Sequence, residues 1–334
     1  MDDQELSVSV TDYRSHRKDE SRTLMAASKS TVAYRFSGES RMKHTILGAG
    51  AIGGLVGATL ASIGEDVTVI VRPEKLPSYP HNLSLERPSG IEPITAPAKA
   101  VTTLTEPIDV LWIATKTYQL QTALELVKQS PRHVIPLLNG VDHIEVLRAR
   151  FGKESVIPAT IAVEAERSGP GKFIQRSPFI RLNLASSSES LMGAIVEKLR
   201  KLGFTCQFIQ NEQTLLWNKL CFLAPFALVT SASGMNVGEI LADPSWKEKL
   251  KSTVAEACAV ANASGAELDA AQIYTVFEGV PPAMRSSMQK DVAAGRQLEL
   301  DAIGGAIVRG GERYDIDVSN AASLMAAIRA KAAA

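Results

Sequence analysis

Three glycines between residues 44 and 72 constrain the fold of this chain more than any other feature. Gly48, Gly50 and Gly53 follow a short apolar run and open a stretch with helical spacing. In such a turn the first glycine allows a sharp bend, the second lets a phosphate approach the backbone, and the third lets the helix pack closely on the strand. The helix N-terminus then offers free N–H groups to an anion. The segment therefore predicts a strand–turn–helix that binds a dinucleotide.

The residues around this turn favour that interpretation over a glycine-rich turn without a ligand. Residues 45–47 are typical of a buried strand, residues 52–63 keep helical spacing until Gly64, and residues 67–71 are typical of a buried parallel strand. The residues that we expect to contact the cofactor here are Gly48, Ala49, Gly50, Ala51, Ile52 and Gly53.

The residue after the second strand indicates which dinucleotide binds. NAD sites usually carry Asp or Glu there, which binds the 2′-hydroxyl of the ribose. This chain has Arg72 at that place and Lys75 three residues later. Because a guanidinium suits a 2′-phosphate, we expect NADP(H) rather than NAD(H), with Arg72 in the cofactor site. In the alternative, Arg72 is a solvated loop residue and Glu74 binds the ribose.

The composition excludes several classes of function. The 334 residues carry a formal net charge of +0, which gives no electrostatic case for nucleic acid or for an anionic membrane surface. No apolar run reaches the length of a membrane span. The three cysteines lie far apart and the histidines show no metal-binding spacing, so we expect reduced thiols and no metal site. These features predict a cytoplasmic protein.

The chain divides into three parts by composition. Residues 1–41 mix charged residues with Ser and Thr and hold few apolar positions, so we expect a disordered segment or an upstream extension without a catalytic role. Residues 42–210 alternate strand and helix patterns and form the predicted dinucleotide-binding domain. Residues 211–334 show helical patterns with short Gly and Pro interruptions, which predicts an all-helical domain for substrate and catalysis.

The fold class that follows is α/β, with an N-terminal Rossmann-type NADP-binding domain and an all-helical C-terminal domain. In the first domain we expect a doubly wound parallel sheet that becomes mixed toward residue 210. The expected strands beyond the first two are 83–86, 94–101, 110–114, 134–138, a hairpin of 156–166 with 172–176, 181–185 and 204–209. The expected helices are one through Leu120, Leu124 and Val127 and one over 191–202.

Several polar residues occupy positions where the pattern predicts apolar ones or where a parallel strand ends. Lys219 has apolar neighbours three and four residues away on both sides along a helix. Desolvation there would lower its pKa and make it a proton donor near neutral pH, unless the side chain reaches out to solvent. Glu299 lies on a similar face, and its alternative is a carboxylate paired with Arg296. Lys116 and Asn139 each follow a predicted strand at its carboxyl end.

Six motifs in this order resemble the ketopantoate reductase (2-dehydropantoate 2-reductase) family from Lys43 to Ile328. The motifs are Gly48–Gly53, Thr115–Gln119, Leu138–Val141, Trp217–Leu220, Ser286–Asp291 and Glu299–Asp301. The resemblance implies reduction of a 2-oxo acid to a 2-hydroxy acid by NADPH, by default ketopantoate to pantoate on the route to pantothenate.

The resemblance also implies roles for individual residues. It makes Lys219 the proton donor and Glu299 the carboxylate over the active site. The other implied roles are cofactor contacts at Lys116 and Ala165, a place between cofactor and substrate for Asn139, and substrate contacts at Ser287, Asn139 and Lys219. Hydride transfer to a ketone makes an alkoxide, which a nearby ammonium stabilises and then protonates. Glu299 would hold that lysine or bind the new hydroxyl.

The chain departs from the family at two positions. The family has asparagines one and two helical turns after the catalytic lysine, where this chain has Leu223 and Ala227. Losing two polar contacts weakens recognition of the hydroxyl of ketopantoate. One alternative is therefore a reductase of a more apolar 2-oxo or β-keto acid, and another is a non-catalytic NADP-binding sensor. We expect a small-molecule 2-oxo acid as the partner, and consider a homodimer as the assembly.

Overall fold

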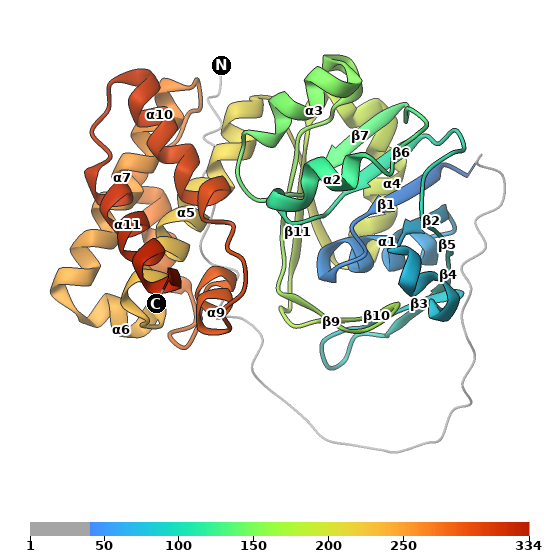
Figure 1. Ribbon diagram of the computed structural model, residues 1–334, viewed down its shortest axis with the longest axis horizontal. Helices are drawn as coiled ribbons and strands as arrows, with labels where there is room; N and C mark the ends of the chain where they lie inside the picture. The colour runs from blue at the N-terminus through green and yellow to red at the C-terminus, as the bar shows by residue number, and fades with distance from the viewer. Residues whose placement is uncertain (1–40, 334) are drawn as a thin grey trace, which may run out of the picture. The chain divides into compact units, whose positions relative to one another are not determined.

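The computed structural model describes residues 41–333, and the prediction for the first forty residues lies outside this range. Its central element is a five-stranded sheet in the order β5-β2-β1-β6-β7, with every neighbouring pair parallel (Figure 1). The strands are β1 Lys43–Leu47, β2 Asp66–Ile70, β5 Lys99–Val101, β6 Val110–Ile113 and β7 His133–Pro136. The strand order reverses between β1 and β6, and ligands of such sheets bind outside the carboxyl ends of the strands at that point. The predicted Rossmann-type fold is confirmed.

The helix α1, Ala51–Ser62, follows β1 and lies between two sheets. A Cβ atom placed on Gly57 would lie 3.2 Å from Ile46 of the central sheet. It would also lie 3.2 Å from Leu83 of a second, four-stranded sheet, which is described below. Most of α1 is buried, so its sequence is apolar on every face, which is typical of a helix enclosed by protein. Its N-cap residue, Gly50, gives the first turn no side-chain hydrogen bond.

The remaining strands form two smaller sheets rather than extending the central one. One is four-stranded, in the order β4-β3-β10-β9, with β3 Asn82–Glu86, β4 Ile94–Pro97, β9 Ala165–Gly169 and β10 Lys172–Gln175. The other is three-stranded, in the order β12-β11-β8, with β8 Ala159–Ala162, β11 Ile180–Ala185 and β12 Phe204–Ile209. Both contain parallel and antiparallel pairs, so the predicted single mixed sheet was wrong.

Three predicted elements between residues 94 and 166 were also wrong in detail. The strand expected over 94–101 is two strands in different sheets, and so is the strand expected over 156–166. The helix expected through Val127 is only α2, Leu120–Leu124, and Val127 instead forms a parallel bridge with Leu104. In each case a distant pairing partner, which local periodicity does not contain, decides where the element ends.

Two further α-helices precede residue 212, in the part of the chain that contains the sheets. They are α3, His143–Phe151, and α4, Glu189–Lys201. From residue 212 onward every regular element of the described range is helical, as the sequence predicts. These elements are α5 Glu212–Ser233, α6 Val237–Ala242, α7 Pro244–Ala263, α8 Ala270–Thr275, a 3-10 helix Val276–Gly279, α9 Ser287–Ala293, a π-helical turn Asp301–Gly305, α10 Ala306–Tyr314 and α11 Ser319–Ala333.

Helix α5 is the core helix of this half, and α7 and α11 pack against it. The side chain of Asn211 accepts a hydrogen bond from Thr214 N at its start, and Gly234 ends it in the left-handed conformation at φ +82°. Among the described residues, α5 alone has the length and apolar composition of a membrane-crossing helix. Because 78% of its apolar window is buried inside the protein, packing against the other helices accounts for that composition.

We expect the variant Gly54→Ala to lower the free energy of unfolding by about 1–3 kcal/mol, because the new methyl group overpacks the space between α1 and the second sheet. A Cβ atom at Gly54 would lie 2.0 Å from the ring of Phe173 in β10. Urea unfolding measures the change. Gly50→Ala is the matched control, because no atom lies within 4 Å of its Cβ position and its φ is −82°. Equal losses in both variants would contradict this account of the packing.

Candidate active site

The glycine turn before α1 has the geometry that a dinucleotide phosphate requires. Gly48 has φ +99°, and a Cβ atom there would lie 2.8 Å from the backbone of Ala114 at the end of β6. A Cβ atom on Gly53 would lie 2.1 Å from Gly48 O, so side chains at both positions are excluded. Gly50 by contrast faces open space. The uncapped N–H groups of α1 and this open face together fit a pyrophosphate at the carboxyl edge of the sheet.

A second turn at the same edge carries Asn139 and Gly140, three and four residues after Pro136, which ends β7. Gly140 has φ +83°, and a Cβ atom there would lie 2.3 Å from Ala302 O in the π-helical turn. Only glycine allows this approach of the two backbones. The contact brings Asn139 beside the helical segment that directly follows Glu299. Single π-helical turns inside helices often occur at functional sites.

The Glu299 carboxylate is the centre of the polar cluster at this edge. Only 6% of the residue is exposed, and four donors from the sheet half surround the carboxylate. Thr117 donates from its backbone N and from Oγ1 to Oε1, both at 3.1 Å. Lys116 Nζ donates to Oε2 at 2.8 Å, and Asn139 Nδ2 donates to the same oxygen at 3.2 Å. The predicted alternative pairing of Glu299 with Arg296 is wrong, because Arg296 binds Asp291.

Lys116 is held in its charged form by two carboxylates. Its Nζ lies 2.8 Å from Glu299 and 3.4 Å from Asp291 Oδ2. Burial alone would lower the pKa of Lys116, but the charges and hydrogen bonds of Glu299 and Asp291 outweigh burial and leave that pKa above its ordinary value. This lysine therefore supplies a fixed positive charge at the edge of the sheet.

Lys219 has the opposite electrostatic environment. Its side chain rises from α5, and Nζ donates to Asn139 Oδ1 at 3.1 Å. Burial lowers the pKa of Lys219 to about 8, although the charge of Glu299 acts in the raising direction. The side chain therefore does not take the alternative course into solvent. No hydrogen bond joins Lys219 to Glu299 within the described part of the chain, and Asn139 links the two by donating to Glu299 and accepting from Lys219.

The other predicted site residues lie in different surroundings. Ser287 is exposed at the first position of α9. The neighbouring Ser286 is buried, where it caps α9 through Gln289 N and hydrogen-bonds Thr230 of α5. Ala165 begins β9 and is partly buried. The roles of these residues, like those of Lys219 and Glu299, stay predictions.

Two members of the polar cluster were missed as site residues by sequence reasoning. Thr117 gives Glu299 two of its four donors, and Asp291 is the second carboxylate on Lys116. Both fall inside motifs quoted for the family resemblance. A signal was present for Thr117, because it follows Lys116 at the carboxyl end of a strand. Asp291 had only its spacing of four residues from Ser287, which places both on one face of a helix.

Comparison with known proteins identifies the family. Residues 44–186 match the family described as ketopantoate reductase PanE/ApbA, and residues 211–332 match its C-terminal domain. The chain belongs to this family. The 2-dehydropantoate 2-reductase of Caulobacter vibrioides is 30% identical over 298 residues, which cover 86% of this chain and 98% of that protein. This ketopantoate reductase family member is therefore an NADP-dependent oxidoreductase, and the family reduces 2-oxo acids with NADPH.

Solved structures show the same fold. A ternary complex of D-mandelate dehydrogenase with NADH and anilino(oxo)acetate aligns with a TM-score of 0.76 at 23% identity, covering 87% of this chain and 99% of that one. A dimeric ketopantoate reductase from Staphylococcus aureus aligns with a TM-score of 0.72 at 19% identity, covering 87% and 99%. At these identities the likeness establishes the fold alone.

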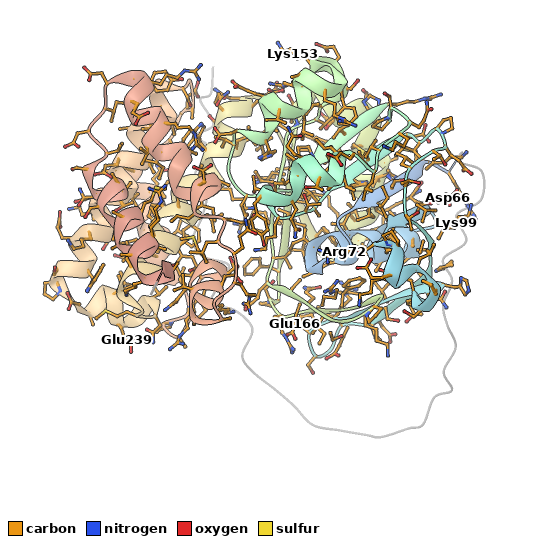
Figure 2. The ribbon with its side chains drawn as sticks, viewed as in Figure 1. Asp66, Arg72, Lys99, Lys153, Glu166 and Glu239 are labelled. Atoms are coloured by element: carbon orange, nitrogen blue, oxygen red, sulfur yellow. The ribbon has the colours of Figure 1, made fainter. Side chains whose placement is uncertain are left out.

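Arg72 follows β2 and its side chain is exposed on the sheet half (Figure 2). It forms no ion pair with any residue from 41 to 333, so its charge is available to a 2′-phosphate. We expect Arg72→Ala to raise the Michaelis constant for NADPH at least tenfold more than that for NADH, since a charge-assisted contact contributes about 1.5–3 kcal/mol. Steady-state kinetics with both cofactors measures the ratio, and equal effects on the two would contradict the assignment.

Proposed function

We propose that this chain reduces a 2-oxo acid with NADPH through Lys219 as the proton donor, and that the substrate is 2-dehydropantoate, giving pantoate in pantothenate biosynthesis. The observation that carries the proposal is the environment of Lys219. Its ammonium lies inward on Asn139, its pKa is lowered to about 8, and it stands at the carboxyl edge of the sheet beside the Glu299 cluster. A lysine with these properties is poised to give up a proton near neutral pH.

Reduction requires charge stabilisation where the ketone oxygen becomes an alkoxide. The bound cofactor supplies the hydride. The Lys219 ammonium stabilises the negative charge as it develops on the oxygen and then transfers its proton there. Asn139 holds Nζ through Oδ1, while its own Nδ2 is held by Glu299. Both the oxygen and the nitrogen of the Asn139 amide are therefore hydrogen-bonded. The amide orients the Lys219 ammonium toward the substrate and, being neutral, places no second charge beside it.

Two further groups complete the proposed site. Glu299 accepts four hydrogen bonds from described residues, and we assign it the role of orienting Asn139, which holds Lys219, or of binding the new hydroxyl that reduction forms. Ser287 is exposed on α9, which suits a contact to the substrate carboxylate. We place cofactor contacts at the turn residues 48–53, at Lys116 and at Ala165.

The domain boundaries and setting belong to the same proposal. We divide the chain into a dinucleotide-binding domain at 42–210 and a helical domain at 211–334, since β12 ends at Ile209 and α5 begins at Glu212. We place the reaction in the cytoplasm, where pantothenate precursors and NADPH meet. A homodimer is the proposed assembly, because one structural neighbour is described as a dimeric ketopantoate reductase.

We expect NADPH oxidation with 2-dehydropantoate, and a loss of about 10²–10⁴-fold in kcat in Lys219→Met. The kcat for reduction should fall above pH 8, because the donor is the protonated amine and its pKa is about 8. A panel of 2-oxo acids is assayed by absorbance at several pH values. Lys290→Met is the matched control, because the ammonium of Lys290 forms a single, exposed ion pair, with Glu164, among residues 41–333.

Two results would contradict the proposal in different ways. Unchanged turnover in Lys219→Met would remove the proton-donor role. An absence of turnover with every acid tested, combined with tight NADPH binding, would favour the non-catalytic sensor. In both cases thermal unfolding of the variants establishes that they are folded.

A more apolar 2-oxo acid is the second candidate substrate. Leu223 and Ala227 follow Lys219 on α5 at positions where the family has asparagines, and Ala227 is 1% exposed. No polar side chain therefore stands at these two places to bind a substrate hydroxyl. The D-mandelate dehydrogenase neighbour, which was solved with anilino(oxo)acetate, shows that this fold also accommodates a 2-oxo acid analogue with an aromatic group.

We expect Leu223→Asn to raise the ratio of kcat/KM for 2-dehydropantoate to that for 2-oxoisovalerate by at least tenfold, since an amide at this place can bind the hydroxyl that only the former carries. Leu223 is partly buried, so the polar substitution is tolerated more easily than at Ala227. Leu223→Met is the control and keeps the ratio of the parent. The ratio is measured with saturating NADPH. An unchanged ratio in Leu223→Asn would show that position 223 does not determine the preference between the two acids.

A further inference from the structure

A buried histidine near Lys219 takes no part in the chemistry described so far. His143 is the first residue of α3 and follows Asn139 by four positions. Only 3% of the residue is exposed, and neither Nδ1 nor Nε2 has a hydrogen-bond partner among residues 41–333. A buried polar group without a partner is rare, because leaving it unsatisfied costs about 1–3 kcal/mol. Its place in the fold therefore needs an explanation.

A salt bridge and a shared apolar cluster connect α3 with α5 near His143 and Lys219. Within α3, Arg148 Nη2 binds Glu212 Oε2 at 2.7 Å, and Ile144 lies with Leu216 in one apolar cluster. His143 lies five residues before Arg148, about 7.5 Å along the axis of α3. Lys219 lies seven residues after Glu212, about 10.5 Å along the axis of α5. His143 and Lys219 each lie beyond this salt bridge along their own helix, and the charge of Lys219 acts on His143.

The electrostatics agree with this placement. Burial and the nearby charge of Lys219 lower the pKa of His143 to about 3, so its imidazole is neutral at every pH at which an enzyme of this kind works. A neutral imidazole has one ring nitrogen that can accept a hydrogen bond. The Lys219 ammonium has three donors, and Asn139 Oδ1 is its single acceptor in the described range. The ketone oxygen of the substrate takes a second, which leaves a third donor without an acceptor.

We propose that His143 is a positioning residue for Lys219: its neutral imidazole accepts the third donor of the ammonium through one bridging water and keeps Nζ turned toward Asn139 and the substrate. This inference rests on the proposed function of Lys219. An acceptor behind the ammonium stabilises the charged form, so His143 offsets part of the desolvation that lowers the pKa of Lys219. The lysine then stays protonated below pH 8 and titratable just above it.

The other charged groups near the two residues are three ion-paired carboxylates and the exposed Glu145. Glu299 is the acidic group that acts on Lys219, and Lys116 neutralises it. The charged pairs on either side of His143 along the chain are Asp142 with Arg309 at 2.5 Å and Arg148 with Glu212 at 2.7 Å. A change in the titration of Lys219 on removal of the imidazole is therefore assigned to His143 itself.

The test is the pH profile of reduction in His143→Phe, which keeps the volume and removes the acceptor. We expect the pH at which kcat is half-maximal to fall by about one unit relative to the parent. His143→Gln keeps an acceptor and returns the profile toward that of the parent. His133→Phe is the matched control, because His133 lies at the start of β7, at the amino edge of the sheet, and leaves the profile unchanged.

A second measurement separates this inference from the proposed function. The titration of Lys219 Nζ is followed by NMR on protein with isotopically labelled lysine, and its signal is identified by its loss in Lys219→Met. A shift of this titration to lower pH in His143→Phe supports the inference even if no 2-oxo acid is turned over. A folded His143→Phe protein with the parent titration and the parent pH profile would overturn it.

Discussion

The site depends on one buried carboxylate. Glu299 lies in the helical half of the described chain, and all four of its hydrogen-bond donors come from turns at the carboxyl edge of the parallel sheet. Removing an ion from water costs several kcal/mol, and the cost is recovered only when a counter-charge and good hydrogen bonds replace the water. Lys116 supplies the charge and Thr117 the backbone N–H. The Glu299 carboxylate therefore joins the helical part of the chain to the edge of the parallel sheet. Breaking any of its hydrogen bonds would leave a buried charge without a partner and cost free energy.

Two lysines near this carboxylate have opposite pKa shifts, and the contrast indicates their roles. Lys116 is paired with two carboxylates, which raise its pKa, whereas desolvation lowers the pKa of Lys219 to about 8. Groups whose environments drive their pKa values apart are typically divided between fixed charge and proton transfer. Lys116 is suited to hold an anionic group or a carboxylate in place. Lys219 is suited to exchange a proton, because both of its forms are accessible near neutral pH.

The sequence predicts those parts of the site that depend on residues close together along the chain. The glycine turn at 48–53 is specified by backbone conformation, and Lys219 stands out because its helical neighbours are apolar. The partner of Glu299 could not be predicted in the same way, since Lys116 is 183 residues away along the chain. Only the fold determines that Glu299 pairs with Lys116 and that the nearby Arg296 pairs with Asp291 instead. The same limit applies to β8 and β9, which local pattern joins into one strand and distant pairing separates into two sheets.

Glu299 lies at one end of a buried helical face, directly before the π-helical turn Asp301–Gly305. Glu299, Ile303 and Ile307 are spaced by four residues, and all three are nearly fully buried, so the carboxylate ends an otherwise apolar face. A polar residue where the core pattern demands an apolar one marks a site at which function overrides packing. The π-helical turn Asp301–Gly305 and the close contact of Gly140 with Ala302 O hold this end of the face against the sheet. Backbone contacts rather than a flexible side chain thus fix the carboxylate, and a group fixed in advance needs no reorganisation when charge develops beside it.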